Sequence, residues 1–181
     1  MSQQFVFFII GLPCSGKSSV AQFIAQRYDC VHLSTEQIRA SLMKIDQEDD
    51  DCDFTLQQQT DVYNKMSNDL HFLLKSGKSV VVDGVYRSID RRNEIFEIAS
   101  CYDSVKRVFA YHLTCDENVA IKRLIYRKEQ GTVAPAGVKG YSKIKLEFEP
   151  VDYSKFVEID NTYDLDYTIN KIVDNIEKRI K

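Results

Sequence analysis

Short runs of apolar residues alternate along this chain with longer stretches in which apolar residues recur every three or four positions. The runs predict buried strands, and the helical periodicity predicts amphipathic helices between them. Strands are predicted at residues 5–10, 30–33, 79–82, 108–113 and 157–159. Helices are predicted at residues 18–28, from 34 or 35 to 43, and at 56–75, 90–100, 117–128 and 165–180. Strands that are apolar throughout and alternate with helices are typical of a parallel sheet covered on both faces, so we expect an α/β fold with a central five-stranded parallel sheet.

Length and composition limit the classes of protein that fit. With 181 residues, 44% hydrophobic, the chain is long enough for one domain, so residues 1–181 are predicted to form a single domain. No apolar stretch reaches 18 residues, and no positive charge precedes the first apolar run, which excludes a membrane span and a signal peptide. The five cysteines lack a CxxC spacing, which argues against a disulfide framework or a zinc site. We therefore expect a cytoplasmic protein without membrane partners.

The first strand runs into Gly11-Leu12-Pro13-Cys14-Ser15-Gly16-Lys17-Ser18, which fits the P-loop pattern GxxxxGK[S/T] between a strand and a helix. In this setting, backbone N–H groups surround a phosphate chain, the lysine reaches the terminal phosphates and the last hydroxyl binds magnesium. The motif predicts binding of ATP with Mg²⁺, and Lys17 is also predicted to be catalytic. The residues predicted to bind the nucleotide are Gly11, Pro13, Cys14, Ser15, Gly16, Lys17, Ser18 and Ser19.

Asp83 closes the apolar run of residues 79–82, at the carboxyl end of a predicted parallel strand. Ligands of open α/β sheets bind at this edge, so Asp83 is predicted to join Ser18 at the metal. An aspartate that simply opens a loop is the alternative. Glu36 and Arg39 begin the helix that follows the second predicted strand, at the same edge of the sheet, and lie three residues apart on one face. Glu36 can accept a proton from a hydroxyl while Arg39 binds an anion of the acceptor, although an ordinary ion pair explains the spacing equally well.

Five segments, GLPCSGKSSVA, LSTEQIR, VVVDGVYRSIDRR, AIKRLIYRK and KLEFEP, together resemble the small P-loop kinases grouped with polynucleotide 5′-kinases and zeta toxins. The resemblance implies a P-loop NTPase fold with a helical lid. It also implies that Glu36 is the general base, at a position where that family usually has aspartate. The matching lid arginines are Arg123 and Arg127, which the resemblance implies are catalytic and reach the phosphates of ATP when the lid closes. The lid is expected at about residues 123–142. From composition alone, two arginines four residues apart also describe an exposed helix face.

The predicted activity is transfer of the γ-phosphoryl group of ATP to a hydroxyl acceptor. Glu36, Arg39, Asp83 and Arg87 are the residues predicted to contact that acceptor. The net charge of −3 gives no overall attraction to nucleic acid, so a small metabolite and a nucleic-acid or nucleoside 5′-hydroxyl stay open as acceptors. Two alternatives lack an acceptor, namely a regulatory ATPase and a binding protein that keeps the P-loop without catalysis. A GTPase-like switch is excluded by the absence of NKxD and DxxG motifs.

Overall fold

The computed structural model describes residues 3–42, 54–130 and 137–180. Within these residues, five parallel strands form one sheet in the order β2-β3-β1-β4-β5. The strands are β1 Gln4–Ile10, β2 Val31–Ser34, β3 Val80–Gly84, β4 Val105–Thr114 and β5 Phe156–Asp160. The helices are α1 Lys17–Arg27, α2 Thr35–Leu42, α3 Leu56–Lys75, α4 Ile89–Ser100, α5 Glu117–Glu129, α6 Val138–Leu146 and α7 Leu165–Ile180. The predicted five-stranded parallel sheet is confirmed.

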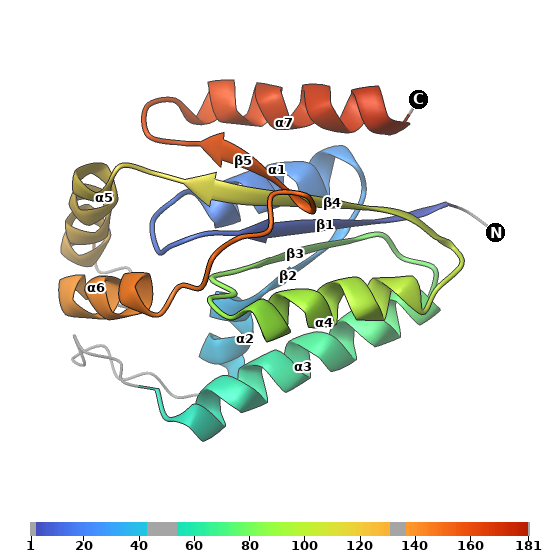
Figure 1. Cartoon of the computed structure of the whole chain (residues 1–181), viewed down its shortest axis with the longest axis horizontal. Coiled ribbons are helices and arrows are strands. Elements are labelled where there is room, and N and C mark those ends of the chain that lie inside the picture. The colour runs from blue at the N-terminus through green and yellow to red at the C-terminus, as the bar shows by residue number, and fades with distance from the viewer. Residues whose placement is uncertain (1–2, 43–53, 131–136, 181) are drawn as a thin grey trace.

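Helices cover both faces of the sheet, with α1 and α7 on one side and α3 and α4 on the other (Figure 1). Side chains of a strand point alternately to the two faces, and β1 shows this clearly. Phe7 and Ile9 pack in the cluster under α1 and α7, whereas Val6, Phe8 and Ile10 pack in the cluster under α3 and α4. Burial on both faces explains why this strand is apolar throughout.

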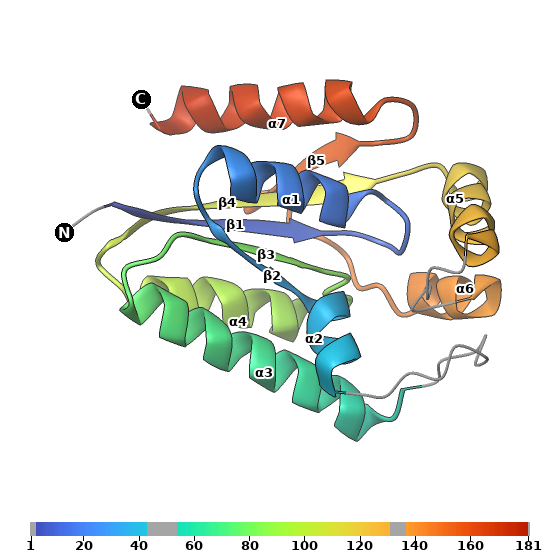
Figure 2. The ribbon, with the colours of Figure 1, turned by 180° about the vertical axis from the view of Figure 1, so that it is seen from behind.

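All five strands run in the same direction, so their carboxyl ends meet at one edge of the sheet, where α5 and α6 lie (Figure 1). Figure 2 shows α2 at this same end of the molecule. The chain builds β2 and β3 on one side of β1 and then β4 and β5 on the other. A reversal of strand order opens a crevice beyond the strand ends, and the P-loop follows β1 into that crevice.

The predicted helix and strand limits agree with the structure to within one or two residues, apart from β4, which begins at Val105 instead of residue 108. The sequence pattern predicts no helix between residues 128 and 165, whereas the structure has α6 there, from Val138 to Leu146. Within the lid expected at about residues 123–142, residues 131–136 lie outside the described residues. No described helix is long and apolar enough to cross a membrane.

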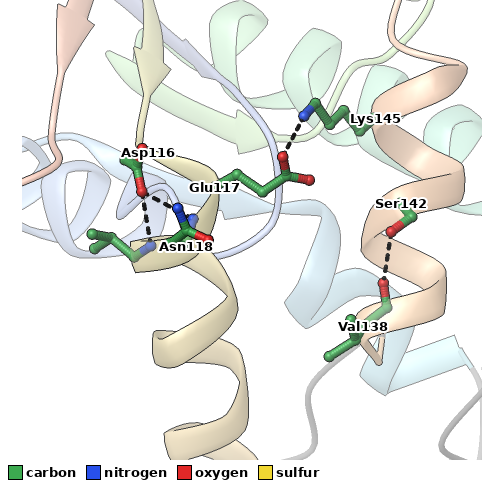
Figure 3. A network of polar contacts seen from close by, with 7 residues as sticks. Asp116, Glu117, Asn118, Val138, Ser142 and Lys145 are labelled. Carbon is green, nitrogen blue, oxygen red and sulfur yellow. Dashed lines mark hydrogen bonds and ion pairs between the residues drawn. The ribbon is translucent and has the colours of Figure 1, made fainter.

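Contacts with α5, and not the local sequence, hold α6 in place. Tyr141 is only 1% exposed and packs against Ala120 and Leu124 of α5. Lys145 of α6 donates to the Glu117 carboxylate at the start of α5, with 2.7 Å between Nζ and Oε2 (Figure 3). A segment of nine residues with Gly140 in its first turn gives only a weak helical signal, so tertiary packing decides the conformation here.

Candidate active site

A cavity of about 800 Å³ opens at the carboxyl edge of the sheet. The P-loop and the start of α1 line one side of it, and α2 and the end of β3 line the opposite side. Four residues of α5, together with Tyr63 of α3, Asn161 and Leu165, also line it. Several chain segments that are distant in sequence therefore face one space, at the place where open α/β sheets bind ligands.

Two glycines allow the P-loop to take its shape. Gly11 has φ 149°, and a Cβ there would lie 2.3 Å from the backbone oxygen of Leu113. Gly16 has φ 92°, and a Cβ there would lie 2.0 Å from the amide nitrogen of Asn161. Both glycines have backbone angles and close neighbours that L side chains do not tolerate. The loop leads directly into α1, whose first N–H groups and positive dipole end favour an anion.

Lys17 is buried, with only 8% of its surface exposed, yet it lines the cavity. Its ammonium group donates to the backbone oxygen of Leu12 at 2.7 Å. Burial lowers the pKa of Lys17, and the nearby Asp83 carboxylate opposes that shift. Ser18 and Ser19 follow on the exposed side of the helix start and also line the cavity. This arrangement presents a cation and two hydroxyls to the same space, which suits a phosphate chain.

Asp83 is 2% exposed, and its carboxylate makes polar contacts with two side chains of β2. Its Oδ1 accepts from the Ser34 hydroxyl at 3.2 Å, and its Oδ2 lies 2.7 Å from Nε2 of His32. Asp83 and Ser18 are both oxygen donors lining the cavity, which is the chemistry that magnesium prefers. The described residues contain no group of three His, Cys, Asp or Glu side chains that could hold a metal. A magnesium ion here fits the residues present only if nucleotide phosphates and water supply further ligands.

Glu36 and Arg127 meet across the cavity. Glu36 lies in the first turn of α2, and its Oε1 is 3.0 Å from Nη2 of Arg127 on α5. Both side chains are a little more than one third exposed. Arg39 lines the same side of the cavity as Glu36, and its guanidinium carbon lies 4.7 Å from the centre of the Phe54 ring. Three of the residues predicted to contact the acceptor, Glu36, Arg39 and Asp83, therefore line one cavity.

Arg123 and Arg127 lie on the same helix but have different environments. Arg123 donates to the backbone oxygens of Cys14, Asn161 and Thr162 at 3.3, 3.0 and 3.2 Å. It also contacts the thiol of Cys115 at 3.4 Å. Its guanidinium group thus joins the P-loop to the loop before α7 while lining the cavity.

Arg87 is the one predicted acceptor residue that the structure does not bring to this place. It is not among the residues that line the cavity. Its guanidinium group pairs with Glu147 and donates to the side-chain oxygen of Gln59. Arg87 thus joins the start of α3 to the segment after α6. The sequence pattern does not predict these contacts, because the partners lie far apart along the chain.

Two side chains that the sequence analysis passed over belong to the site. His32 contacts Asp83, as described above. Asn161 is 2% exposed, lines the cavity and donates from Nδ2 to the backbone oxygen of Ser15 at 2.8 Å. Its Oδ1 accepts from the hydroxyl of Thr168 at 3.0 Å. Asn161 follows β5 directly, so the rule that singled out Asp83 at a strand end also applies to it.

Solved structures with the same fold include several kinases. The chain resembles a sugar kinase from Janibacter sp. HTCC2649 (TM-score 0.71, 13% identity, 97% of this chain and 95% of the other covered). It also resembles a gluconokinase from Sinorhizobium meliloti 1021 (TM-score 0.68, 18% identity, 98% and 94% covered). A third match is the APS kinase of Mycobacterium tuberculosis, solved in complex with AMPPNP and APS (TM-score 0.69, 16% identity, 98% and 99% covered). At such low identities these likenesses show the fold alone, which is that of P-loop kinases.

No curated protein matches the chain. The profile of one protein family, by contrast, matches residues 6–147, which hold most of β1, the P-loop and most of the cavity wall. The match covers more than half of the chain, so the protein belongs to the AAA domain family AAA_33.

Proposed function

We propose that this protein is an ATP-dependent phosphotransferase that moves the γ-phosphoryl group of ATP to a hydroxyl acceptor, with residues 1–181 acting as a single P-loop kinase domain. The observation that carries the proposal is the shared cavity, which is lined by Lys17 of the P-loop, Glu36 of α2 and Arg127 of α5. A nucleotide site alone needs only the first of these. The kinase names of three proteins with this fold support the same conclusion.

The P-loop side of the cavity would hold the donor. The first N–H groups of α1 and the ammonium of Lys17 would bind the β- and γ-phosphates, and Asn161 would hold the loop in shape. Ser18 and Asp83 would hold magnesium, Asp83 through a metal-bound water. When bound, the ion supplies positive charge that offsets the negative charge of the transferring group.

The α2 side would hold the acceptor. Its hydroxyl oxygen attacks the γ-phosphorus, the bond from that phosphorus to the bridging oxygen breaks, ADP leaves, and the hydroxyl proton passes to the Glu36 carboxylate. Before this transfer, Arg127 would turn from Glu36 to the transferring phosphoryl oxygens, and the segment at about residues 123–142, which includes parts of α5 and α6, would act as the lid. Arg39 would bind an anionic group of the acceptor, which can belong to a small metabolite or to a nucleic-acid end.

A second candidate is a nucleotide-binding module without phosphoryl transfer. The Glu36–Arg127 ion pair favours it, because a carboxylate oxygen that accepts from a guanidinium group is already occupied and does not face a hydroxyl acceptor. In this alternative the pair would close the cavity over bound ATP and stay intact. The two candidates differ in whether the γ-phosphoryl group of ATP is transferred to another molecule.

Transfer of labelled γ-phosphate from ATP with Mg²⁺ tests the proposal. The acceptor panel contains 5′-hydroxyl DNA and RNA oligonucleotides, nucleosides, nucleotides and sugars. We expect one class to take label, with loss of transfer in Lys17→Ala and in Glu36→Gln and normal transfer in the exposed control variants Lys75→Ala and Glu97→Gln. ATP binding without label on any acceptor would support the binding module instead.

We also propose a cytosolic location. The four described cysteines, Cys14, Cys30, Cys101 and Cys115, are free thiols. Free thiols are typical of a reducing compartment. Fractionation of cells that express the tagged chain, with a secreted protein as the marker for export, tests this location.

A further inference from the structure

His32 makes a close polar contact that the site chemistry described so far does not use. Its Nε2 lies 2.7 Å from Oδ2 of Asp83, and its side chain is 16% exposed. We propose that His32 is a positioning residue that orients the Asp83 carboxylate toward the metal-nucleotide complex, an inference that rests on the proposed function of Asp83.

Strand register explains why His32 reaches Asp83 together with Ser34. Strands β2 and β3 are parallel neighbours, and Ser34 is paired with Asp83. His32 lies two positions before Ser34, so both side chains leave β2 on the same face. Each therefore reaches a different oxygen of one carboxylate, Ser34 at Oδ1 and His32 at Oδ2. A carboxylate held at both oxygens cannot rotate about its terminal bond without losing a hydrogen bond.

The pairing leaves Asp83 able to act on a ligand. An ionised carboxylate accepts at about four lone-pair positions, of which His32 and Ser34 use two. Because a carboxylate cannot donate, Nε2 of His32 carries the proton in this contact. Hydrogen-bond partners of groups at a metal commonly set both the orientation and the affinity of the site, and their loss typically weakens metal binding about 10- to 100-fold. Asp83 is almost fully buried, so contacts within the protein, and not solvent, hold its carboxylate. His32 makes one of these contacts and is therefore placed to have this role.

A purely structural role for His32 predicts something different. In that case, removal of the imidazole would lower the stability of β2 and leave the metal affinity of the folded protein unchanged. The two roles are separated by a measurement of metal binding made on folded protein, without reference to turnover.

The test is titration of the full chain with Mn²⁺ in the presence of ADP, with free Mn²⁺ followed by electron paramagnetic resonance. His32→Phe keeps a ring but removes the donor, and His32→Leu repeats the test in case the first variant does not fold. His32→Gln restores an N–H donor of similar reach, His71→Leu is the matched control at an exposed histidine, and Asp83→Asn is the reference for loss of the carboxylate. Circular dichroism confirms folding before each titration.

We expect Mn²⁺ to bind about 10-fold more weakly to His32→Phe and His32→Leu, with recovery in His32→Gln and no change in His71→Leu. Unchanged Mn²⁺ affinity in a folded His32→Phe or His32→Leu protein would overturn the proposal, as would unchanged affinity in Asp83→Asn. Phosphoryl transfer is measured separately. Weakened Mn²⁺ binding in a protein whose wild type labels no acceptor would sustain the role of His32 while removing the kinase function.

Discussion

Replacement of Asn161 by alanine should loosen the P-loop. The Asn161 side chain donates to the Ser15 oxygen inside the loop and lies against Gly16, where a Cβ would come within 2.0 Å of its amide nitrogen. Without the amide, the buried oxygen of Ser15 loses this donor, which costs about 1–3 kcal/mol. The Thr168 hydroxyl loses its acceptor on Asn161, but this costs less, because the hydroxyl still donates to the backbone oxygen of Asp164 at 3.0 Å.

The free energy of unfolding should therefore fall by about 2 kcal/mol, all of it from the unpaired backbone oxygen of Ser15. For a chain of this length, 1 kcal/mol corresponds to about 2–4 °C in Tm, so Asn161→Ala should melt about 4–8 °C below wild type. The nucleotide would have to order the loosened loop on binding, so ATP affinity should fall by a similar free energy, about 10-fold or more. Differential scanning calorimetry and isothermal titration of ATP measure the two effects.

A second variant separates the hydrogen bond from the volume of the side chain. Asn161→Asp keeps the shape but cannot donate to Ser15, and it adds a negative charge to the wall of a phosphate site. It should weaken ATP binding at least as much as Asn161→Ala. Asn170→Ala, at an exposed position of α7, is the control and should behave as wild type. A Tm within 1 °C of wild type and unchanged ATP affinity in Asn161→Ala would refute the reasoning, since a lost bond to a buried oxygen should cost about 1 kcal/mol or more.

Three further substitutions test the P-loop, a buried guanidinium and a buried imidazole. Gly11→Ala would place Cβ 2.3 Å from the Leu113 backbone oxygen at φ 149°, so ATP binding should be lost and Tm lowered in the same titration and melting experiments. Arg92, 3% exposed, donates to four backbone oxygens around residues 87–88 and 149–150, and Arg92→Lys should lower the free energy of urea unfolding by about 3 kcal/mol, whereas an unchanged value would contradict that role. Burial lowers the pKa of His112 to about 4, while the unfolded chain protonates near 6.5, so this imidazole's contribution to stability is complete above pH 6.5 and is lost as the pH falls toward 4. His112→Gln should unfold in urea with a shallower dependence on pH in that window, and an unchanged slope would count against this assignment.

The fold could be predicted because its signals are local. The run from residue 5 to residue 10 is apolar at every position, and β1 is buried on both faces of the sheet. The glycine spacing of the P-loop follows from backbone angles that the loop must adopt at Gly11 and Gly16. α6 could not be predicted in the same way, since Tyr141 is buried in a cluster with Ala120 and Leu124 of α5. A short helix whose stability comes from a neighbouring element carries little of that information in its own sequence.

Several of the site's polar contacts join residues whose spacing in the sequence does not reveal that they meet. Asn161 is 146 positions from Ser15, and His32 is 51 positions from Asp83. No periodicity joins such residues. The sequence does show where each strand ends, and ligands of open α/β sheets bind at the carboxyl ends of the strands. This rule places Asp83 and the residue after β5 at the same edge of the sheet. Applied to every strand, that rule would have included Asn161 among the candidates.

The two arginines of α5 show how a helix can be held at one end and respond at the other. Their four-residue spacing predicts a shared face, and both do line the cavity. Arg123, nearer the start of α5, donates to three backbone oxygens from the P-loop and the loop before α7, so a ligand cannot recruit it without breaking several contacts. Arg127, one turn further, contacts a carboxylate that is itself more than one third exposed. Exchange of that carboxylate for a phosphoryl oxygen replaces one charged partner by another, so the energetic cost of movement is concentrated at Arg123 and is small at Arg127. We therefore expect the proposed lid to pivot near Arg123 and to bring Arg127, but not Arg123, to the transferring group.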